Sequence, residues 1–269
     1  MAASACAHAL DRPVVIAGAT GRTGELVYKQ LKSKGVSVRA LVRNATKARE
    51  LLGCNKCDES EGVFLADVTK PETLPPAVKG AGGLVIASSA APVCHPFPFC
   101  HFPPGAGPVD VDWVGAKALL AAFASASSSG GRGLGHVVLV STMGTTTPEK
   151  NPGPLGHIYF YKLNFEAHLM SSALPYTVIK PCGLGDSEPA KAQLVVGHDD
   201  QVNPSPPMIP RADVARVAVA ALLQPNIAAG LRFDLCSQQG PPTTDDGLVD
   251  VLKSARWPWQ REEVTGLVV

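Results

Sequence analysis

Short apolar runs alternate along the chain with segments in which apolar residues recur every three or four positions. The short runs are rich in Val, Ile and Leu, which is typical of strands buried on both faces of a parallel sheet. We expect strands at residues 13–18, 36–42, 63–66, 84–88, 136–141, 176–180 and 231–236. The segments between them have the helical period. We expect helices at residues 23–34, 45–52, 72–78, 112–126, 158–172, 211–223 and 244–254.

This alternation predicts an α/β fold with a doubly wound, mostly parallel sheet and right-handed crossovers. The length of 269 residues suits one domain that spans the whole chain, 1–269. Two segments lie outside the pattern. Residues 90–108 carry six prolines and form a long connection. Residues 186–210 are also rich in proline, with weak strand signals, and we interpret them as a small lid-like insert.

Composition narrows the function classes. Charged residues make up 17% of the chain and the net charge is +1. The sequence therefore lacks the excess of basic residues that would favour nucleic acid as a partner. Hydrophobic residues make up 45%, yet no apolar run approaches the roughly 18 residues of a membrane span. The Ala-rich N-terminus lacks the basic start and apolar core of a secretory signal. It fits either the trimmed end of an organelle transit peptide or a disordered start.

Seven scattered cysteines favour free thiols over a disulfide framework. Cys54 and Cys57 form a Cys-x-x-Cys motif, and Cys94 and Cys100 each precede a histidine. The first pair is expected at the opposite edge of the sheet from the second, so we predict no shared metal site. The Cys-x-x-Cys motif is then either a redox pair or two surface thiols near a helix end.

A glycine-rich turn connects the first expected strand to the first expected helix. Gly18 permits the tight turn, Gly21 lets the backbone approach a pyrophosphate, and Gly24 lets the helix pack close to the strand. The helix N-terminus offers free N–H groups to a phosphate. The turn therefore predicts a dinucleotide site. Its other expected contacts are Thr20, Arg22 and Thr23.

The end of the second strand favours NADP(H) over NAD(H). An NAD site usually has an acidic residue there, which accepts a hydrogen bond from the ribose 2′-hydroxyl. This chain instead has Arg43, whose guanidinium suits a 2′-phosphate, and Arg22 can approach the same phosphate.

Further contacts are expected where the third and fourth strands end. Asp67 is placed to accept a hydrogen bond from the adenine amine, and Val68 to cover the ring. Ser88 and Ser89 are expected to line the adenosine ribose. Ligands of open α/β sheets bind at this edge, outside the carboxyl ends of the strands.

Together these motifs resemble the atypical short-chain dehydrogenases/reductases, and most of all the NmrA-like plant and algal NAD(P)-binding proteins. The motifs that carry the resemblance include GATGRTG, VRALVRN, VDWVGAK, VVLVSTMG, LPYTVIKPCGL and RADVARVAVAAL. The resemblance implies a Rossmann sheet of about seven strands with NADP(H) as ligand. It also implies that Lys162 reaches the nicotinamide ribose. The segment expected to pass over the nicotinamide is Pro181, Cys182, Gly183 and Leu184.

The chain departs from the family pattern at the proton donor. Catalytic members have a Tyr four residues before the Lys, and the Lys lowers the pKa of the phenol. Ile158 occupies that position here. Tyr159 shares a helix face with Lys162, whereas Tyr161 does not. Ser141 stands where the catalytic Ser is expected.

Glu166 lies four residues after Lys162 and is its expected ion-pair partner on the same helix. The candidate catalytic residues are therefore Lys162, Ser141 and Tyr159, of which Lys162 is also a candidate cofactor ligand.

Two functions fit this sequence. One is an NADPH-dependent reductase of a small carbonyl, quinone or enone. The other is a catalytically silent NADP(H)-binding redox sensor or assembly partner for another protein. The resemblance favours the chloroplast, in the stroma or at a membrane surface, and the cytoplasm is the alternative.

Overall fold

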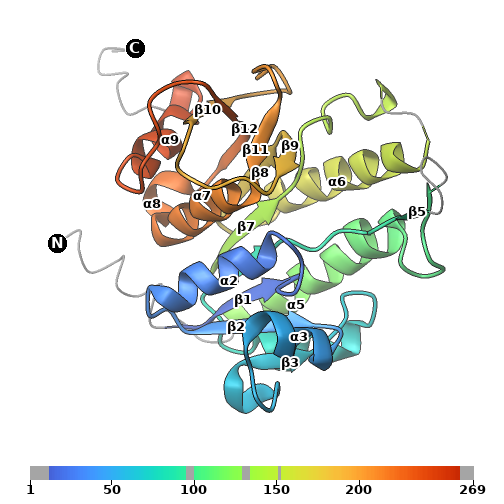
Figure 1. Cartoon of the computed structure of the whole chain (residues 1–269). Coiled ribbons are helices and arrows are strands. Elements are labelled where there is room, and N and C mark those ends of the chain that lie inside the picture. Colours follow the sequence, from blue (N-terminus) through green and yellow to red (C-terminus); the bar gives the residue numbers. More distant parts are fainter. Residues whose placement is uncertain (1–11, 95–99, 129–133, 151–152, 261–269) are drawn as a thin grey trace, which may run out of the picture.

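An eight-stranded sheet forms the centre of the molecule (Figure 1). The computed structural model describes residues 12–94, 100–128, 134–150 and 153–260. The strand order is β3-β2-β1-β4-β7-β8-β12-β10, and all neighbours are parallel except β10 and β12. The strands are β1 (Val14–Ala17), β2 (Val38–Val42), β3 (Val63–Leu65), β4 (Gly83–Ile86), β7 (His136–Val140), β8 (Tyr176–Pro181), β10 (Gln193–Gly197) and β12 (Leu231–Gln238). The predicted doubly wound α/β fold is confirmed.

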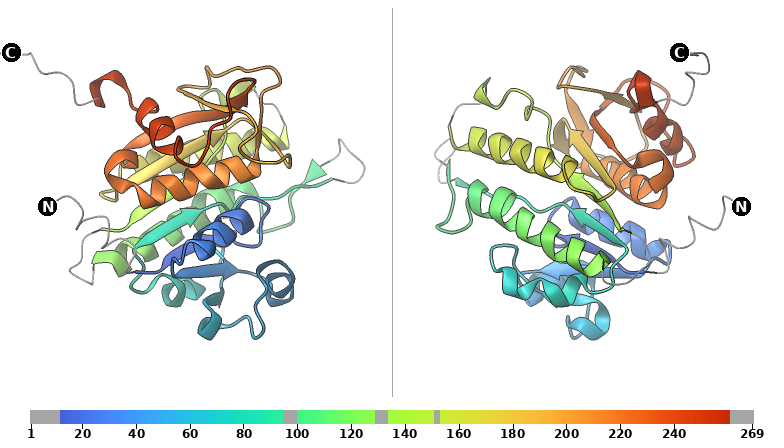
Figure 2. Two further views of the ribbon diagram at one scale, coloured as in Figure 1. Left: turned by 60° about the vertical axis from the view of Figure 1, so that its left-hand side comes forward. Right: turned by 180° about the vertical axis from the view of Figure 1, so that it is seen from behind.

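Helices cover both faces of this sheet (Figure 2). One face carries α2 (Gly24–Ser33), α3 (Ala45–Leu52), α7 (Arg211–Leu223), α8 (Pro225–Ala228) and α9 (Leu248–Ser254). The other face carries α4 (Pro75–Val78), α5 (Ala116–Ser128) and α6 (Pro154–Met170). Crossovers on both faces leave the carboxyl ends of β1 and β4 open at the point where the winding changes direction.

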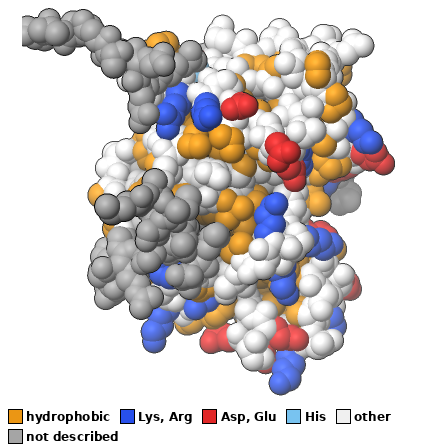
Figure 3. Space-filling view, turned by 90° about the vertical axis from the view of Figure 1, so that its left-hand side faces the viewer, with side chains coloured by type: hydrophobic (Ala, Val, Ile, Leu, Met, Phe, Trp, Pro, Cys, Tyr) orange, Lys and Arg blue, Asp and Glu red, His pale blue; other side chains and the backbone are white. Residues whose placement is uncertain are grey.

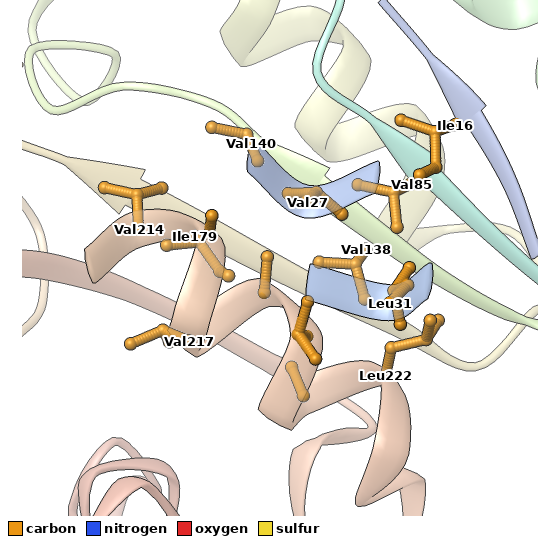
Figure 4. Close-up of a cluster of buried hydrophobic side chains, with 14 of the residues drawn as sticks. Ile16, Val27, Leu31, Val85, Val138, Val140, Ile179, Val214, Val217 and Leu222 are labelled. Carbon is orange, nitrogen blue, oxygen red and sulfur yellow. The ribbon is translucent and has the colours of Figure 1, made fainter. Parts of the chain in front are cut away.

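The core consists of two hydrophobic layers separated by the sheet. Side chains alternate along β1, so that Ile16 packs into one layer and Val15 into the other. Both are fully buried, as expected for a strand covered on both faces. Figure 4 shows the first layer, where Val27 and Leu31 of α2 and Leu222 of α7 pack on the same side of the sheet. This packing fixes the start of α2 against the end of β1.

The structure differs from expectation in three places. The Pro-rich stretch 186–210 supplies β10, which joins the main sheet as an eighth strand. It also supplies β11 (Met208–Pro210), which pairs with β9 (Gly183–Gly185). The helix expected at 112–126 begins earlier, as a π-helix at Val109–Gly115 that continues into α5. The connection after β4 contains a short hairpin of β5 (Val93–Cys94) and β6 (Cys100–His101).

The prediction of free thiols is wrong for the described cysteines, which form three disulfides. Two pairs are close in sequence: Cys54 with Cys57, and Cys94 with Cys100. The third pair, Cys182 with Cys236, is brought together because β8 and β12 are neighbours in the sheet. Cys54 and Cys57 are buried, so the alternative of two surface thiols is also wrong.

The surface carries charges of both signs. Figure 3 shows Lys and Arg side chains interspersed with Asp and Glu on one face, in keeping with the net charge of +1. Within the described ranges, no helix has the length and hydropathy of a membrane span.

The burial of His136, at the start of β7, makes the free energy of unfolding depend on pH. Its Nε2 lies 2.9 Å from Thr177 Oγ1, whose hydroxyl donates to Ala228 O. Its Nδ1 has no partner within the described chain. Burial lowers the pKa of His136 from 6.5 to about 4. The unfolded chain binds the proton more readily than the folded chain does. The contribution of neutral His136 to the free energy of unfolding is therefore complete above pH 6.5 and is lost as the pH falls towards 4.

We therefore expect His136→Gln to flatten the acid side of the stability profile. The lowered pKa corresponds to roughly 3 kcal/mol at most. Urea denaturation between pH 4 and pH 7 measures the effect. The same dependence in the wild type and the variant would show that other groups cause the loss.

Candidate cofactor and active site

The glycine-rich turn is pressed against the end of β4. Gly18 has a φ of +82°, and a Cβ at this position would come within 2.8 Å of Ser88 N and 2.9 Å of the Ala87 carbonyl carbon. A Cβ at Gly24 would collide with the carbonyl group of Gly18. Glycine is therefore required at both positions. Gly18 lets the turn approach the end of β4, and Gly24 lets α2 approach the turn.

The start of α2 has the features of a phosphate site. Gly21 N donates to Gly18 O at 2.8 Å, which closes the turn. The N-cap residue Thr23 makes no side-chain capping bond, and the backbone amides of Arg22 and Thr23 have no hydrogen-bond partner within the described ranges. A Cβ at Gly21 would meet only Gly18 O, at 3.1 Å, so the space beyond it is open. The amides and the helix dipole can hold an anion there.

The two arginines predicted to bind a phosphate lie in different settings. Arg22 forms an ion pair with Asp186, which also accepts from Arg211 at 2.7 Å. Arg43 is exposed at the end of β2 and has no ion pair in the described part of the chain. The next residue, Asn44, caps α3 by accepting from Lys47 N at 3.0 Å. Arg43 is therefore available to an anionic ligand.

A cavity of about 240 Å³ lies at the carboxyl ends of β4 and β7, between the glycine-rich turn and α6. It brings together seven of the residues singled out in the sequence: Thr23, Ser88, Ser89, Ser141, Tyr159, Lys162 and Leu184. Its remaining lining residues are Ala87, Val140, Thr142 and Ile158. The walls are mostly apolar, and hydroxyl groups and the ammonium group of Lys162 are among the lining.

Lys162 forms an ion pair with Asp112, and not with Glu166 as expected. Lys162 Nζ lies 3.0 Å from Asp112 Oδ1, and both side chains are buried. Asp112 Oδ2 accepts the N–H of Ala90 at 2.9 Å. The carboxylate thus comes from the π-helix before α5, far from Lys162 in sequence. The spacing of residues within α6 indicated Glu166, because it relates only residues of the same helix. Asp112 belongs to another element.

Glu166 holds Ser141 instead. The Ser141 hydroxyl donates to Glu166 Oε1, and Arg232 Nε donates to Glu166 Oε2 at 2.8 Å. Ser141 lines the cavity, but its proton is committed to a buried carboxylate. Its oxygen can still accept a hydrogen bond from a ligand.

The remaining predicted residues lie outside the cavity lining. Asp67 Oδ1 accepts from the amide and the hydroxyl of Thr69, each at 2.9 Å. Val68 is buried against Gly115 of the π-helix. The three residues before Leu184 also have structural roles. Pro181 ends β8, Cys182 is in a disulfide, and Gly183 starts β9.

A buried ionic cluster lies at the end of β8. Lys180, at the end of β8, is fully buried and lies 2.7 Å from Asp200 Oδ1 and 3.4 Å from Asp234 Oδ1. Burial raises the pKa of Asp234. Burial also acts to raise the pKa of Asp200, but hydrogen bonds from Lys180 and from backbone amides hold it below its usual value.

Asp112, the partner of the cavity-lining Lys162, is the site residue that sequence reasoning missed. The signal was present, because an acidic residue stands among apolar residues in the segment VDVDWVG. In the sequence that segment fits both a family motif and the start of a helix. Recognising Asp112 required knowing that the π-helix turns it inwards.

Comparison with known proteins identifies the family. Residues 18–225 match the family model described as NAD(P)H-binding. The chain belongs to this family. It is 35% identical over 258 residues to an uncharacterized chloroplastic protein of Arabidopsis thaliana, covering 90% of this chain and 75% of that protein. It is 31% identical over 239 residues to sanguinarine reductase of Eschscholzia californica, covering 78% and 83%.

The fold also resembles that of solved proteins. An oxidoreductase from Lactococcus lactis superposes with a TM-score of 0.65 at 20% identity, covering 91% of this chain and 99% of that one. At this identity the likeness shows a shared fold, which is the Rossmann-like arrangement described above. The nicotinamide cofactor predicted from the glycine-rich turn is confirmed at the level of the family.

We expect Gly21→Ala to weaken binding of the nicotinamide cofactor by at least about tenfold, because a methyl group would occupy the space beside the phosphate. The melting temperature should change little, since the added Cβ meets only Gly18 O. Gly247→Ala, at the N-cap of α9, is the matched control and should leave binding unchanged. Titration calorimetry with NADPH and NADH measures both variants. Wild-type affinity in Gly21→Ala would place the phosphate elsewhere.

Proposed function

We propose that this protein is an NADP(H)-dependent reductase of a small carbonyl, quinone or enone. The observation that carries the proposal is the cavity beside the glycine-rich turn, where apolar walls and Lys162 meet at the carboxyl ends of β4 and β7. A bound nicotinamide supplies a hydride to a carbon placed next to it. The cavity offers that carbon a mostly apolar environment. The relative named sanguinarine reductase gives independent support for a reductase.

The roles proposed for the side chains follow from their contacts. Lys162, held by Asp112, donates to the ribose next to the nicotinamide. Leu184 and Ile158 form part of the apolar walls around the reacting carbon. Ser141 accepts a hydrogen bond from the substrate or the cofactor, because its hydroxyl already donates its own hydrogen bond to Glu166. When the product needs a proton, water or a substrate group supplies it.

The second candidate function is cofactor binding without turnover, as a redox sensor or an assembly partner. The replacement of the proton-donor tyrosine by Ile158 favours it, and so does the commitment of the Ser141 hydroxyl to Glu166. Steady-state oxidation of NADPH with quinones, enones and aldehydes separates the two. Turnover above the buffer rate supports the reductase. Binding without turnover on every substrate class supports the second function.

We further propose that the protein acts in the chloroplast, in the stroma or at a membrane surface. The name of the Arabidopsis relative marks it as chloroplastic. Imaging of a fluorescent fusion of the full chain tests the proposal, and a cytoplasmic signal would contradict it.

The choice of NADP(H) over NAD(H) is assigned to Arg43. Arg43→Asp should lower NADPH affinity by about tenfold or more, because it removes one charge-assisted contact and adds repulsion. NADH affinity should change little. Lys47→Asp, one turn into α3, makes the same charge reversal nearby and should leave the ratio of the two affinities unchanged. Equal losses for NADH and NADPH in Arg43→Asp would remove Arg43 from the 2′-phosphate site.

Proton delivery is not expected to depend on tyrosine. A well-placed general acid contributes typically 100-fold or more to the rate. Tyr159 lines the cavity but is offset from the usual position, and Tyr161 packs edge-on against Phe160. We expect Tyr159→Phe and Tyr161→Phe each to lower kcat by much less than 100-fold. A loss of that size in Tyr159→Phe, with cofactor affinity intact, would identify the offset tyrosine as the acid.

A further inference from the structure

Asp112 is a deeply buried carboxylate with two partners that come from different elements near the cavity. Its side chain is 1% exposed. Oδ2 accepts the N–H of Ala90, which directly follows the cavity-lining residues Ser88 and Ser89 at the end of β4. Oδ1 lies 3.0 Å from the ammonium group of Lys162 on α6. One carboxylate therefore ties the β4 loop to the lysine.

The π-helix that carries Asp112 is itself fixed in place. A Cβ at Gly115 would lie 2.8 Å from Val68 Cγ2 and 3.0 Å from Val68 O, so the helix is pressed against the end of β3. The wider turn of a π-helix is uncommon, and it occurs often at functional sites. The element that carries Asp112 is thus held against the segments that follow β3 and β4.

Lys162 depends on Asp112 for its counter-charge. Ile158, one helical turn before it, offers no polar atom. Glu166, one turn after it, is engaged by Ser141 and Arg232. Within the described chain, Asp112 is the only acidic residue in ion-pair contact with Lys162. Removing one member of a buried ion pair leaves the other charge uncompensated.

We infer that Asp112 is a positioning residue of the cofactor site. It directs the Lys162 ammonium towards the ribose next to the nicotinamide, and its other oxygen holds the backbone of Ala90 in place. The inference rests on the proposed function, since it assumes that a dinucleotide extends from the glycine-rich turn into the cavity. A purely structural role of the ion pair would instead affect the whole protein and every ligand equally.

Two ligands separate these roles. NADPH reaches from the glycine-rich turn to the cavity, whereas adenosine 2′,5′-bisphosphate lacks the nicotinamide ribose. Asp112→Asn keeps the shape of the side chain and removes its charge. We expect it to weaken NADPH binding by about tenfold or more, and to change the affinity for adenosine 2′,5′-bisphosphate by less than about twofold.

Matched variants complete the experiment. Asp110→Asn, on the same π-helix, removes the carboxylate that accepts from Gly107 N at 3.1 Å, and should leave both affinities unchanged. Lys162→Met should reproduce the pattern of Asp112→Asn. The double variant should bind NADPH no more weakly than the weaker single variant, because the two residues act as one unit. The double variant removes both members of the ion pair, so it leaves no buried charge without a partner. It can therefore be measured even if Asp112→Asn alone does not fold.

Calorimetric titration of the full chain with both ligands decides the matter. Selective loss of NADPH affinity with non-additive single variants supports the inference. Equal losses for the two ligands, additive losses in the double variant, or unchanged NADPH affinity in Asp112→Asn would each overturn it. A wild-type protein that binds neither ligand would overturn the proposed function as well, which makes the two failures distinguishable.

Discussion

The close approach of the glycine-rich turn to the end of β4 is the constraint on which the site depends. No side chain fits at Gly18, because the backbone of Ala87 and Ser88 is already in contact. Gly24 in turn lets α2 begin directly against the turn, so its free amides face the crevice where the winding of the sheet changes direction. The same contact places Ser88 and Ser89 beside the cavity. A single backbone contact therefore joins the phosphate end of the site to its reactive end.

Local patterns were enough to predict most of the fold. The helices at Ala45–Leu52 and Arg211–Leu223 have the expected bounds, because caps and apolar period are properties of the segment itself. Strand β10 was not predicted as part of the main sheet, since its pairing depends on the exposed edge of β12. The link between Cys182 and Cys236 is also non-local, because it exists only once β8 and β12 are neighbours.

The candidate site shows the same division. Strand-end reasoning placed Ser88 and Ser141 at one edge of the sheet, and both line the cavity. The i+4 rule then assigned Glu166 to Lys162, although that rule describes isolated, solvated helices. In the folded chain, Glu166 accepts hydrogen bonds from Arg232 and Ser141. Lys162 pairs instead with Asp112, which belongs to another element. Ion pairs of buried residues depend on tertiary packing, and the sequence alone does not reveal it.

The central claim is that one dinucleotide extends from the glycine-rich turn to Lys162. The most direct measurement is a crystal structure of the full chain grown with NADPH. We predict the pyrophosphate on the amides at the start of α2, the 2′-phosphate beside Arg43, and the nicotinamide ribose within hydrogen-bond distance of Lys162 Nζ. A cofactor bound with its nicotinamide outside the cavity, or with its adenine inside it, would contradict the account.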